Sequence, residues 1–177
     1  MAWISKQSAL TQIETRDEPY LTKSMVSEIK KEIMPRYATG QGALMTTLHL
    51  VQDEYGYIPW QAMVEIGAVI GISPAQVADV VSFYEDYHGE PVGNHVIGVC
   101  QSIACEVCGH QALIDHLKQK LGIDVHETTE DGKFTLLGME CIGSCDNAPC
   151  ALVNGKQFNN LSISMIDELV DQCREEA

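Results

Sequence analysis

The sequence predicts an α+β chain in which an N-terminal helical bundle precedes a small α/β domain. Three observations lead to this prediction. Apolar residues recur at helical spacing in the first half, residues 88–94 (HGEPVGN) interrupt that pattern, and strands alternate with helices from residue 95 onward. The 177 residues have room for a helical segment followed by one compact domain of about 100 residues.

The first two expected helices are marked by their apolar faces and by their ends. Residues 23–34 place their apolar side chains on one face, and Pro35 closes the helix because the residue before a proline avoids helical geometry. Residues 42–56 repeat apolar side chains at the same spacing, and Gly56 is a favourable C-terminal stop. Each helix therefore has one face to bury against a neighbour.

The third and fourth expected helices are marked by their N-termini. Pro59 stands at the expected first position of the third helix. Ser73 and Gln76 form a capping box before the fourth, with Pro74 just inside its start. Short helices cannot each bury an apolar face alone, so we expect one bundle. We place a polar tail over residues 1–21 and the helical segment over residues 22–88.

The second half, residues 89–177, has the element order of a small α/β sandwich. Asn154-Gly155 is a strong signal for a type I′ turn between two strands. The expected elements are a strand over residues 95–100, a helix over 109–122, a strand over 133–139, a hairpin over 150–158 and a helix from Ser164 onward. A thioredoxin-like topology suits this order.

The composition excludes several functions. Eleven Lys and Arg against 25 Asp and Glu give a net charge of −14, and such a surface repels phosphate backbones, so we expect no nucleic-acid binding. No apolar run is long enough to cross a membrane, so we expect no direct membrane insertion. No nucleophile constellation, phosphate-cradling loop or dinucleotide-binding glycine motif is present, so we expect no catalytic residue and no nicotinamide or flavin site in this chain.

Cysteine is the residue type that points to a function. The N-terminus lacks the apolar core of a signal peptide, so we expect the seven cysteines in a reducing compartment. Clustered cysteines there are more often metal ligands or redox thiols than disulfides. Six of the seven stand in two runs, CQSIACEVC at residues 100–108 and CIGSCDNAPC at residues 141–150.

Two interpretations of the runs need no iron. A redox dithiol would use Cys105 and Cys108, a C-x-x-C pair at the start of a helix whose N-terminus favours a thiolate. It leaves Cys100, Cys141 and Cys145 without a role. A structural zinc site would combine Cys105 and Cys108 with the pair Cys141 and Cys145, and Cys100 is again spare.

Two further interpretations use iron. A plant-type [2Fe-2S] site would take Cys100, Cys105 and Cys108 with a distant fourth cysteine, although the helix directly after Cys108 counts against a loop ligand there. Alternatively, Cys100 and Cys105 bind one iron of a [2Fe-2S] cluster, and Cys141 and Cys145 bind the other. Small residues around these cysteines would let backbone N–H groups reach the sulfurs; they are Ser102, Gly143 and Ser144.

Four stretches of the sequence resemble one known family. They are YGYIP, ISPAQVADVVSFYE, HVIGVCQSIAC and TTEDGKFTLLGMECIGSCDNAP. Together they resemble the E-subunit family of bacterial NADH:quinone oxidoreductase (respiratory complex I), whose members are thioredoxin-like [2Fe-2S] ferredoxins. The resemblance includes both the helical half and the cysteine half of the chain.

The resemblance implies a cofactor, a role and a partner. The family's C-x4-C and C-x3-C ligand pairs fall on Cys100 and Cys105 and on Cys141 and Cys145, so these four are expected to bind one [2Fe-2S] cluster. The chain is then an electron carrier that does not oxidise NADH alone, and FMN and NADH bind to a partner subunit. It would be cytoplasmic and peripheral to the inner membrane. NAD-dependent formate dehydrogenases and NAD-reducing hydrogenases contain similar small subunits.

Two cysteines depart from the family pattern. Cys108 and Cys150 are each expected to be a buried thiol without a role at the cluster, and a ligand exchange or a disulfide near the cluster is the alternative. A Rieske-type site is not expected, because His110 lies near the first run but no histidine lies in the second.

Overall fold

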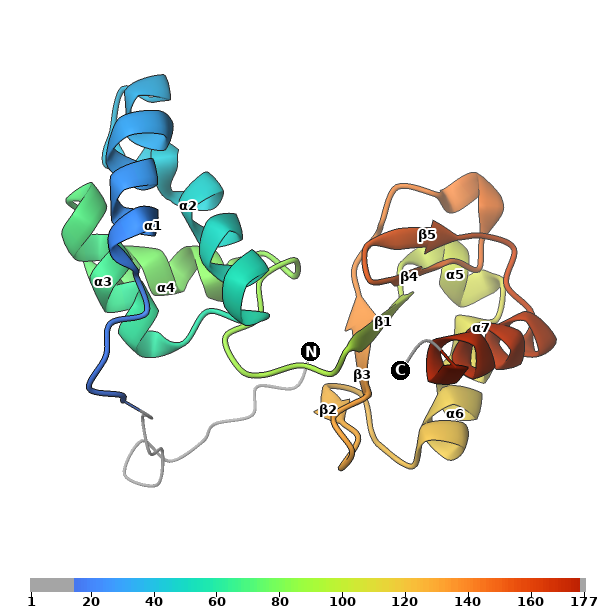
Figure 1. Cartoon of the computed structure of the whole chain (residues 1–177). Coiled ribbons are helices and arrows are strands. Elements are labelled where there is room, and N and C mark those ends of the chain that lie inside the picture. The colour runs from blue at the N-terminus through green and yellow to red at the C-terminus, as the bar shows by residue number, and fades with distance from the viewer. Residues whose placement is uncertain (1–14, 176–177) are drawn as a thin grey trace. The chain divides into compact units, whose positions relative to one another are not determined.

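The chain forms two units, residues 1–91 and residues 92–177, in a computed structural model that describes residues 15–175 (Figure 1). The expected α+β class is confirmed, because the first unit contains helices and the second contains a mixed sheet with helices. Within the described residues, no helix is both long and apolar enough to span a membrane.

Helices build the first unit around one apolar core. Its largest fully buried side chains include Ile29, Leu44, Leu48, Ile58 and Ile66. Its elements are α1 (Lys23–Glu28), a π-helix (Ile29–Ile33), a 3-10 helix (Met34–Arg36), α2 (Gly40–Tyr55), α3 (Trp60–Ile70) and α4 (Pro74–Phe83).

The helix ends follow local sequence signals, with two differences. Gly56 adopts the left-handed conformation after α2, and Ser73 and Gln76 form the predicted capping box of α4. Pro59 is the N-cap of α3 rather than its first residue. The first α-helix ends earlier than predicted, at Glu28, and helical turns then continue through Pro35 as a π-helix and a 3-10 helix, because a proline near the start of the 3-10 helix needs no N–H donor.

Part of the expected polar tail packs on the helices. Residues 1–14 of that tail lie outside the described residues. The ring of Tyr20 stands edge-on to that of Tyr55 at 5.1 Å, and the Tyr55 hydroxyl donates a hydrogen bond to the Tyr20 carbonyl. Leu21 is buried, and its N–H donates to a Glu65 carboxylate oxygen. The helical unit therefore includes residues 20 and 21.

A five-stranded mixed sheet organises the second unit, in the order β2-β3-β1-β4-β5. β1 and β3 are parallel and central, and the other pairs are antiparallel. The strands are β1 (His95–Cys100), β2 (Glu127–Thr128), β3 (Phe134–Met139), β4 (Ala151–Val153) and β5 (Lys156–Phe158). Asn154 and Gly155 both have positive φ, as the predicted type I′ turn requires.

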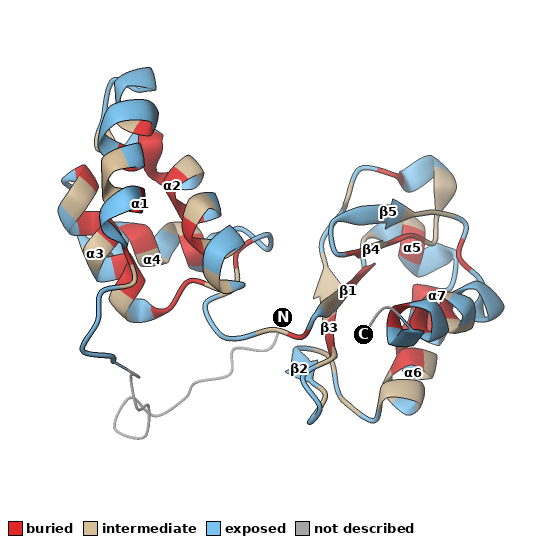
Figure 2. Ribbon diagram, in the orientation of Figure 1, coloured by how far each residue is buried: buried red, intermediate tan, exposed pale blue. Residues whose placement is uncertain are grey.

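Two longer helices pack with the sheet, α6 (His110–Leu121) and α7 (Ile163–Glu175). Leu117, Ile166 and Val170 share a core with strand residues Ile97 and Leu136. Figure 2 shows buried residues along β1 and on both helices. Two short elements that the sequence did not predict are β2 and α5 (Ile103–Val107), which contain two and five residues.

Candidate metal centre

Sheet topology brings the two cysteine runs to the same edge. β1 and β3 run parallel, and Cys100 at the end of β1 pairs with Met139 at the end of β3. The chain therefore leaves both strands at one edge of the sheet. One run continues into α5, whose N-cap is Ser102, and the other into the loop that contains Cys141.

Three thiols are buried together at this edge. The sulfur atoms of Cys100, Cys105 and Cys150 lie within 4.8 Å of one another, and each residue is 1% exposed. Two of these three belong to the predicted ligand set, and the third does not. Cys150 stands opposite Cys100, because β4 begins at the next residue and pairs antiparallel with β1. The Cys100 N–H donates to the Cys150 carbonyl at 3.1 Å.

Two further thiols form an exposed pair. The sulfur atoms of Cys141 and Cys145 are 3.3 Å apart, and Cys145 begins a short 3-10 helix (Cys145–Asn147) that contacts α5. Cys141 raises the pKa of Cys145 most, and Cys100 and Cys105 raise it further by their charge. The contact between this 3-10 helix and α5, which contains Cys105, places the exposed pair next to the buried thiols.

Polar donors from the surrounding loops point at these sulfurs. The pKa of Cys141 is lowered, first by a hydrogen bond from the Gly143 N–H and further by Cys145 and the Ser102 side chain. Gly143 has a φ of +83°, a conformation that favours glycine. Ser144 is buried and donates to Asn159 Oδ1 at 2.8 Å, so its side chain anchors the loop instead.

Burial affects the other half of the site. It raises the pKa of Cys105, while hydrogen bonds from Cys150 oppose this shift. Burial also raises the pKa of Cys150 to about 12. The neighbouring thiols Cys105 and Cys150 thus both have a raised pKa, for which burial is the largest cause.

The donor set fits an iron–sulfur cluster. Thiolates are soft ligands that select iron–sulfur clusters, zinc or Cu(I). Two sulfur pairs from separate loops suit the two irons of a [2Fe-2S] cluster, and N–H and O–H donors near the sulfurs stabilise its negative charge. The ligand assignment to Cys100, Cys105, Cys141 and Cys145 stays a prediction.

Cys108 does not share the environment of these sulfurs. It was expected to be buried, but it is exposed, because it caps the C-terminus of α5 and the left-handed Gly109 then starts α6. His110 is buried, and its Nδ1 lies 3.4 Å from a Glu106 carboxylate oxygen without a hydrogen bond. Among the described residues, the buried cluster of possible metal ligands includes neither Cys108 nor His110, and it also leaves out the predicted ligands Cys141 and Cys145.

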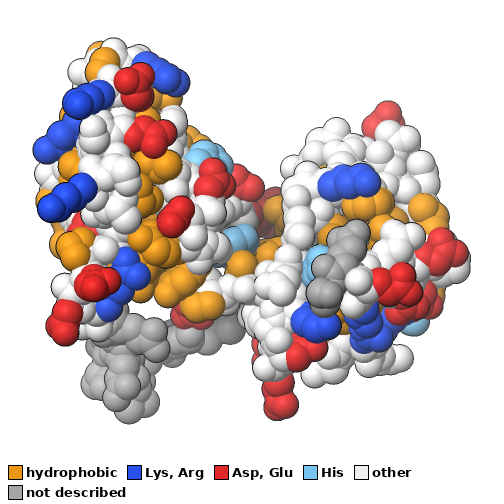
Figure 3. Space-filling model, viewed as in Figure 1, with side chains coloured by type: hydrophobic (Ala, Val, Ile, Leu, Met, Phe, Trp, Pro, Cys, Tyr) orange, Lys and Arg blue, Asp and Glu red, His pale blue; other side chains and the backbone are white. Residues whose placement is uncertain are grey.

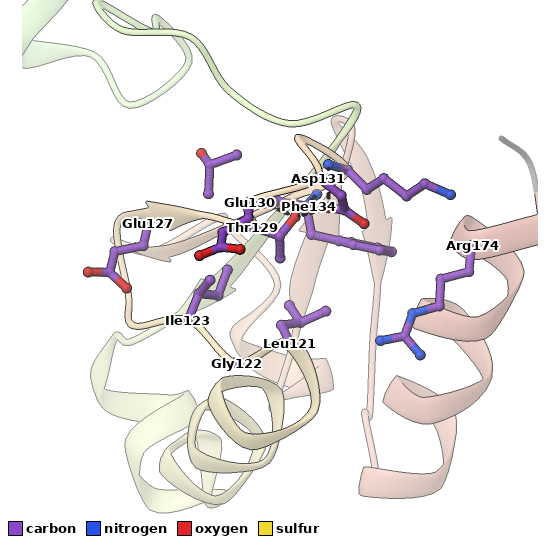
Figure 4. Close-up of a pocket in the computed structure, with 11 residues that line it drawn as sticks. Leu121, Gly122, Ile123, Glu127, Thr129, Glu130, Asp131, Phe134 and Arg174 are labelled. Carbon is purple, nitrogen blue, oxygen red and sulfur yellow. Dashed lines mark hydrogen bonds between the residues drawn. The ribbon is translucent and has the colours of Figure 1, made fainter.

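A separate hollow of about 700 Å³ lies at the other end of the sheet. Its lining includes Gly122 at the end of α6 and Phe134 at the start of β3, whereas the cysteines follow the ends of β1 and β3. Figure 4 shows Arg174 of α7 beside the loop that contains Glu130 and Asp131. No cysteine lines this hollow, so it is not part of the metal centre.

Comparison with known proteins agrees with this geometry. The family described as thioredoxin-like [2Fe-2S] ferredoxin matches residues 30–174. An E subunit of the NADH-quinone oxidoreductase of Rhizobium meliloti is 35% identical over 139 residues, which are 78% of this chain and 83% of that protein. The corresponding E subunit of Mycobacterium bovis is 40% identical over 144 residues, which are 81% of this chain and 57% of that protein.

A solved structure extends the comparison to three dimensions. One chain of the NAD+-reducing [NiFe]-hydrogenase in its air-oxidised state superposes with a TM-score of 0.67 and 26% identity. The similarity covers 82% of this chain but 24% of that chain. The chain described here belongs to the thioredoxin-like [2Fe-2S] ferredoxin family, and its cofactor is a [2Fe-2S] cluster.

Proposed function

We propose that the chain is the [2Fe-2S] electron-transfer subunit of an NADH dehydrogenase module, as in NADH:quinone oxidoreductase. The observation that supports this proposal is a buried group of three thiols (Cys100, Cys105 and Cys150) at the same sheet edge from which the loop with the exposed pair Cys141 and Cys145 departs, in a member of this family. When bound, the cluster accepts and releases one electron. Cys100 and Cys105 would hold one iron, and Cys141 and Cys145 the other.

The chain's own residues prepare this site for added negative charge. The Gly143 N–H and the Ser102 side chain donate to the Cys141 sulfur. Hydrogen bonds to cluster sulfurs and the solvent exposure of the site set the reduction potential. The protein would thus act as a carrier, and NADH oxidation would require a partner.

The partner we propose is a subunit that binds FMN and NADH. Ile103 and Val107 of α5, on either side of the buried Cys105, are 80% and 83% exposed. An exposed apolar pair this close to the sulfurs suits a surface that a second protein covers during electron exchange. The chain would then be cytoplasmic and attached to the inner membrane only through the complex.

We further propose that the helical unit is the main docking element. Phe83 at the end of α4 is 76% exposed and stacks edge-on against Tyr84 at 5.0 Å. Asp and Glu side chains are spread over the visible faces of both units (Figure 3), which favours a basic partner surface. Phe83→Glu should reduce co-purification of the flavin subunit, whereas Tyr37→Glu, an exposed control, should not. Equal recovery would refute the docking role.

The experiment that tests the function is elemental analysis of anaerobically purified protein, with an EPR spectrum after dithionite. About two irons and two sulfides per chain with an S = 1/2 signal would support the carrier. About one zinc per chain without sulfide would favour a zinc module, and a metal-free protein that reduces disulfides would favour a dithiol enzyme.

One observation favours a second candidate for the enzyme complex to which this chain belongs. The superposition with a chain of the NAD+-reducing hydrogenase makes a hydrogenase module a candidate, and a formate dehydrogenase module would be analogous. All three contexts need the same electron carrier. Purification of the native complex, followed by assays for quinone, hydrogen and formate, distinguishes them.

A further inference from the structure

Cys150 lies among the buried sulfurs but has no place in the proposed set of four ligands. Its sulfur is 3.6 Å from the Cys105 sulfur, within the range of a hydrogen bond between sulfur atoms. The Cys150 backbone N–H also donates to the Cys105 sulfur. One residue therefore directs two donors at a single proposed ligand.

The backbone, not the thiol, fixes the position of Cys150. The Cys100 N–H donates to the Cys150 carbonyl at 3.1 Å, which extends the ladder between β1 and β4. On the other side, the Leu161 N–H donates to the Pro149 carbonyl at 2.9 Å. A substitution of the Cys150 side chain should thus leave the backbone donor in place, so that the contribution of the thiol can be measured alone.

The direction of the S–H···S hydrogen bond follows from chemistry. A sulfur that binds iron is a thiolate, which has no proton to donate. If Cys105 is a ligand, the hydrogen atom between the two sulfurs must come from Cys150. Reduction adds one negative charge to the cluster and its ligands, so a donor stabilises the reduced form more than the oxidised form.

We propose that Cys150 is a positioning residue whose thiol donates a hydrogen bond to the Cys105 sulfur and thereby raises the reduction potential of the cluster. This inference rests on the proposed function and its ligand set. It assigns a role to a thiol that the sequence leaves without one. A water molecule would be a poor substitute, because all three sulfur-bearing residues on this side are buried.

The test is a redox titration of the full-length protein, followed by EPR. Cys150→Ala and Cys150→Val remove the donor, and Val also fills the space that Ala leaves empty. Both variants should keep about two irons per chain. Their equilibrium constant for reduction should be about tenfold lower, which corresponds to a fall of about 59 mV in the one-electron reduction potential. Cys150→Ser keeps a hydroxyl donor, so its reduction potential should shift less than that of the alanine and valine variants. Cys108→Ala, an exposed control, should match the wild type.

Two results would overturn the proposal. The first is a potential that stays the same in Cys150→Ala, Cys150→Val and the wild type. The second is loss of iron from both non-donor variants together with retention of iron in Cys105→Ala, because Cys150 would then be a ligand in place of Cys105. A wild-type protein without iron and sulfide would instead refute the proposed function, so the two failures are distinguishable.

Discussion

Gly143 offers a sharp test of the exposed half of the site. Its φ of +83° is unfavourable for an L-residue by roughly 1–2 kcal/mol. A Cβ at this position would meet no atom within 4 Å, so the substitution causes backbone strain but no steric clash. Alanine also lowers the conformational entropy of the unfolded chain, which stabilises the folded state by about 0.4–1 kcal/mol and offsets part of the strain. Gly143→Ala should therefore lower the free energy of unfolding by about 1 kcal/mol.

A matched control separates this strain from the role of the Gly143 N–H. Gly122 has a φ of +71° and the same open space around its Cβ position, but it follows α6, far along the chain from both cysteine runs. Gly122→Ala should cost a similar free energy of unfolding. Only Gly143→Ala should disturb the donor to the Cys141 sulfur, because the backbone there relaxes away from the strained conformation.

The assay has two readouts. Urea unfolding gives the free energy of unfolding, and iron transfer to a chelator, followed by the loss of visible absorbance, gives the lifetime of the cluster. A local destabilisation of about 1 kcal/mol raises the population of the opened site by a factor of about 5. Gly143→Ala should therefore release iron about fivefold faster than Gly122→Ala. Gly143→Asn should partly restore the lifetime, because asparagine tolerates this conformation better. Equal release rates for the two alanine variants would refute the reasoning.

Three further predictions concern a ligand, the sheet and acid stability. Cys141→Ser should abolish cluster binding, measured as iron and sulfide per chain. Thr135→Val should cost about 1–3 kcal/mol, because the buried Gly93 N–H loses its hydroxyl acceptor at 2.7 Å, and hydrogen exchange at Gly93 should accelerate. Hydrogen bonds, first that from His116, lower the pKa of Asp167 below 3.8. The contribution of Asp167 to stability is present above pH 3.8 and is lost as the pH falls through the lowered pKa. Asp167→Asn should therefore make the free energy of unfolding depend less on pH in that acidic range.

Local signals made most of the fold predictable from the sequence. Ser73 and Gln76 start α4, and Gly56 ends α2, because caps depend on neighbouring residues alone. The stretch around Pro35 was less predictable. The change from α-helix to π-helix and then 3-10 helix depends on how Ile29 and Ile33 pack in the bundle, and both are buried.

The site was less predictable than the fold, because it depends on contacts between distant residues. Spacing alone left four interpretations of the cysteine runs, and it could not distinguish Cys108 from Cys150. The exposure of Cys108 depends on α5, a five-residue helix with no periodic signal. The burial of Cys150 depends on the register of β4 against β1, which places it opposite Cys100. One usable signal was its position as the first residue of the hairpin predicted over residues 150–158.

The two sulfur pairs differ in how they can stabilise negative charge. Cys141 and Cys145 are exposed, so water reaches them in addition to donors such as the Gly143 N–H. Cys100 and Cys105 are buried, and protein donors must take the place of water there. A buried pair without such donors would resist reduction. The thiol and the N–H of Cys150 are donors at the place where the sheet excludes solvent, which is why this side chain should matter more for the potential than for iron binding.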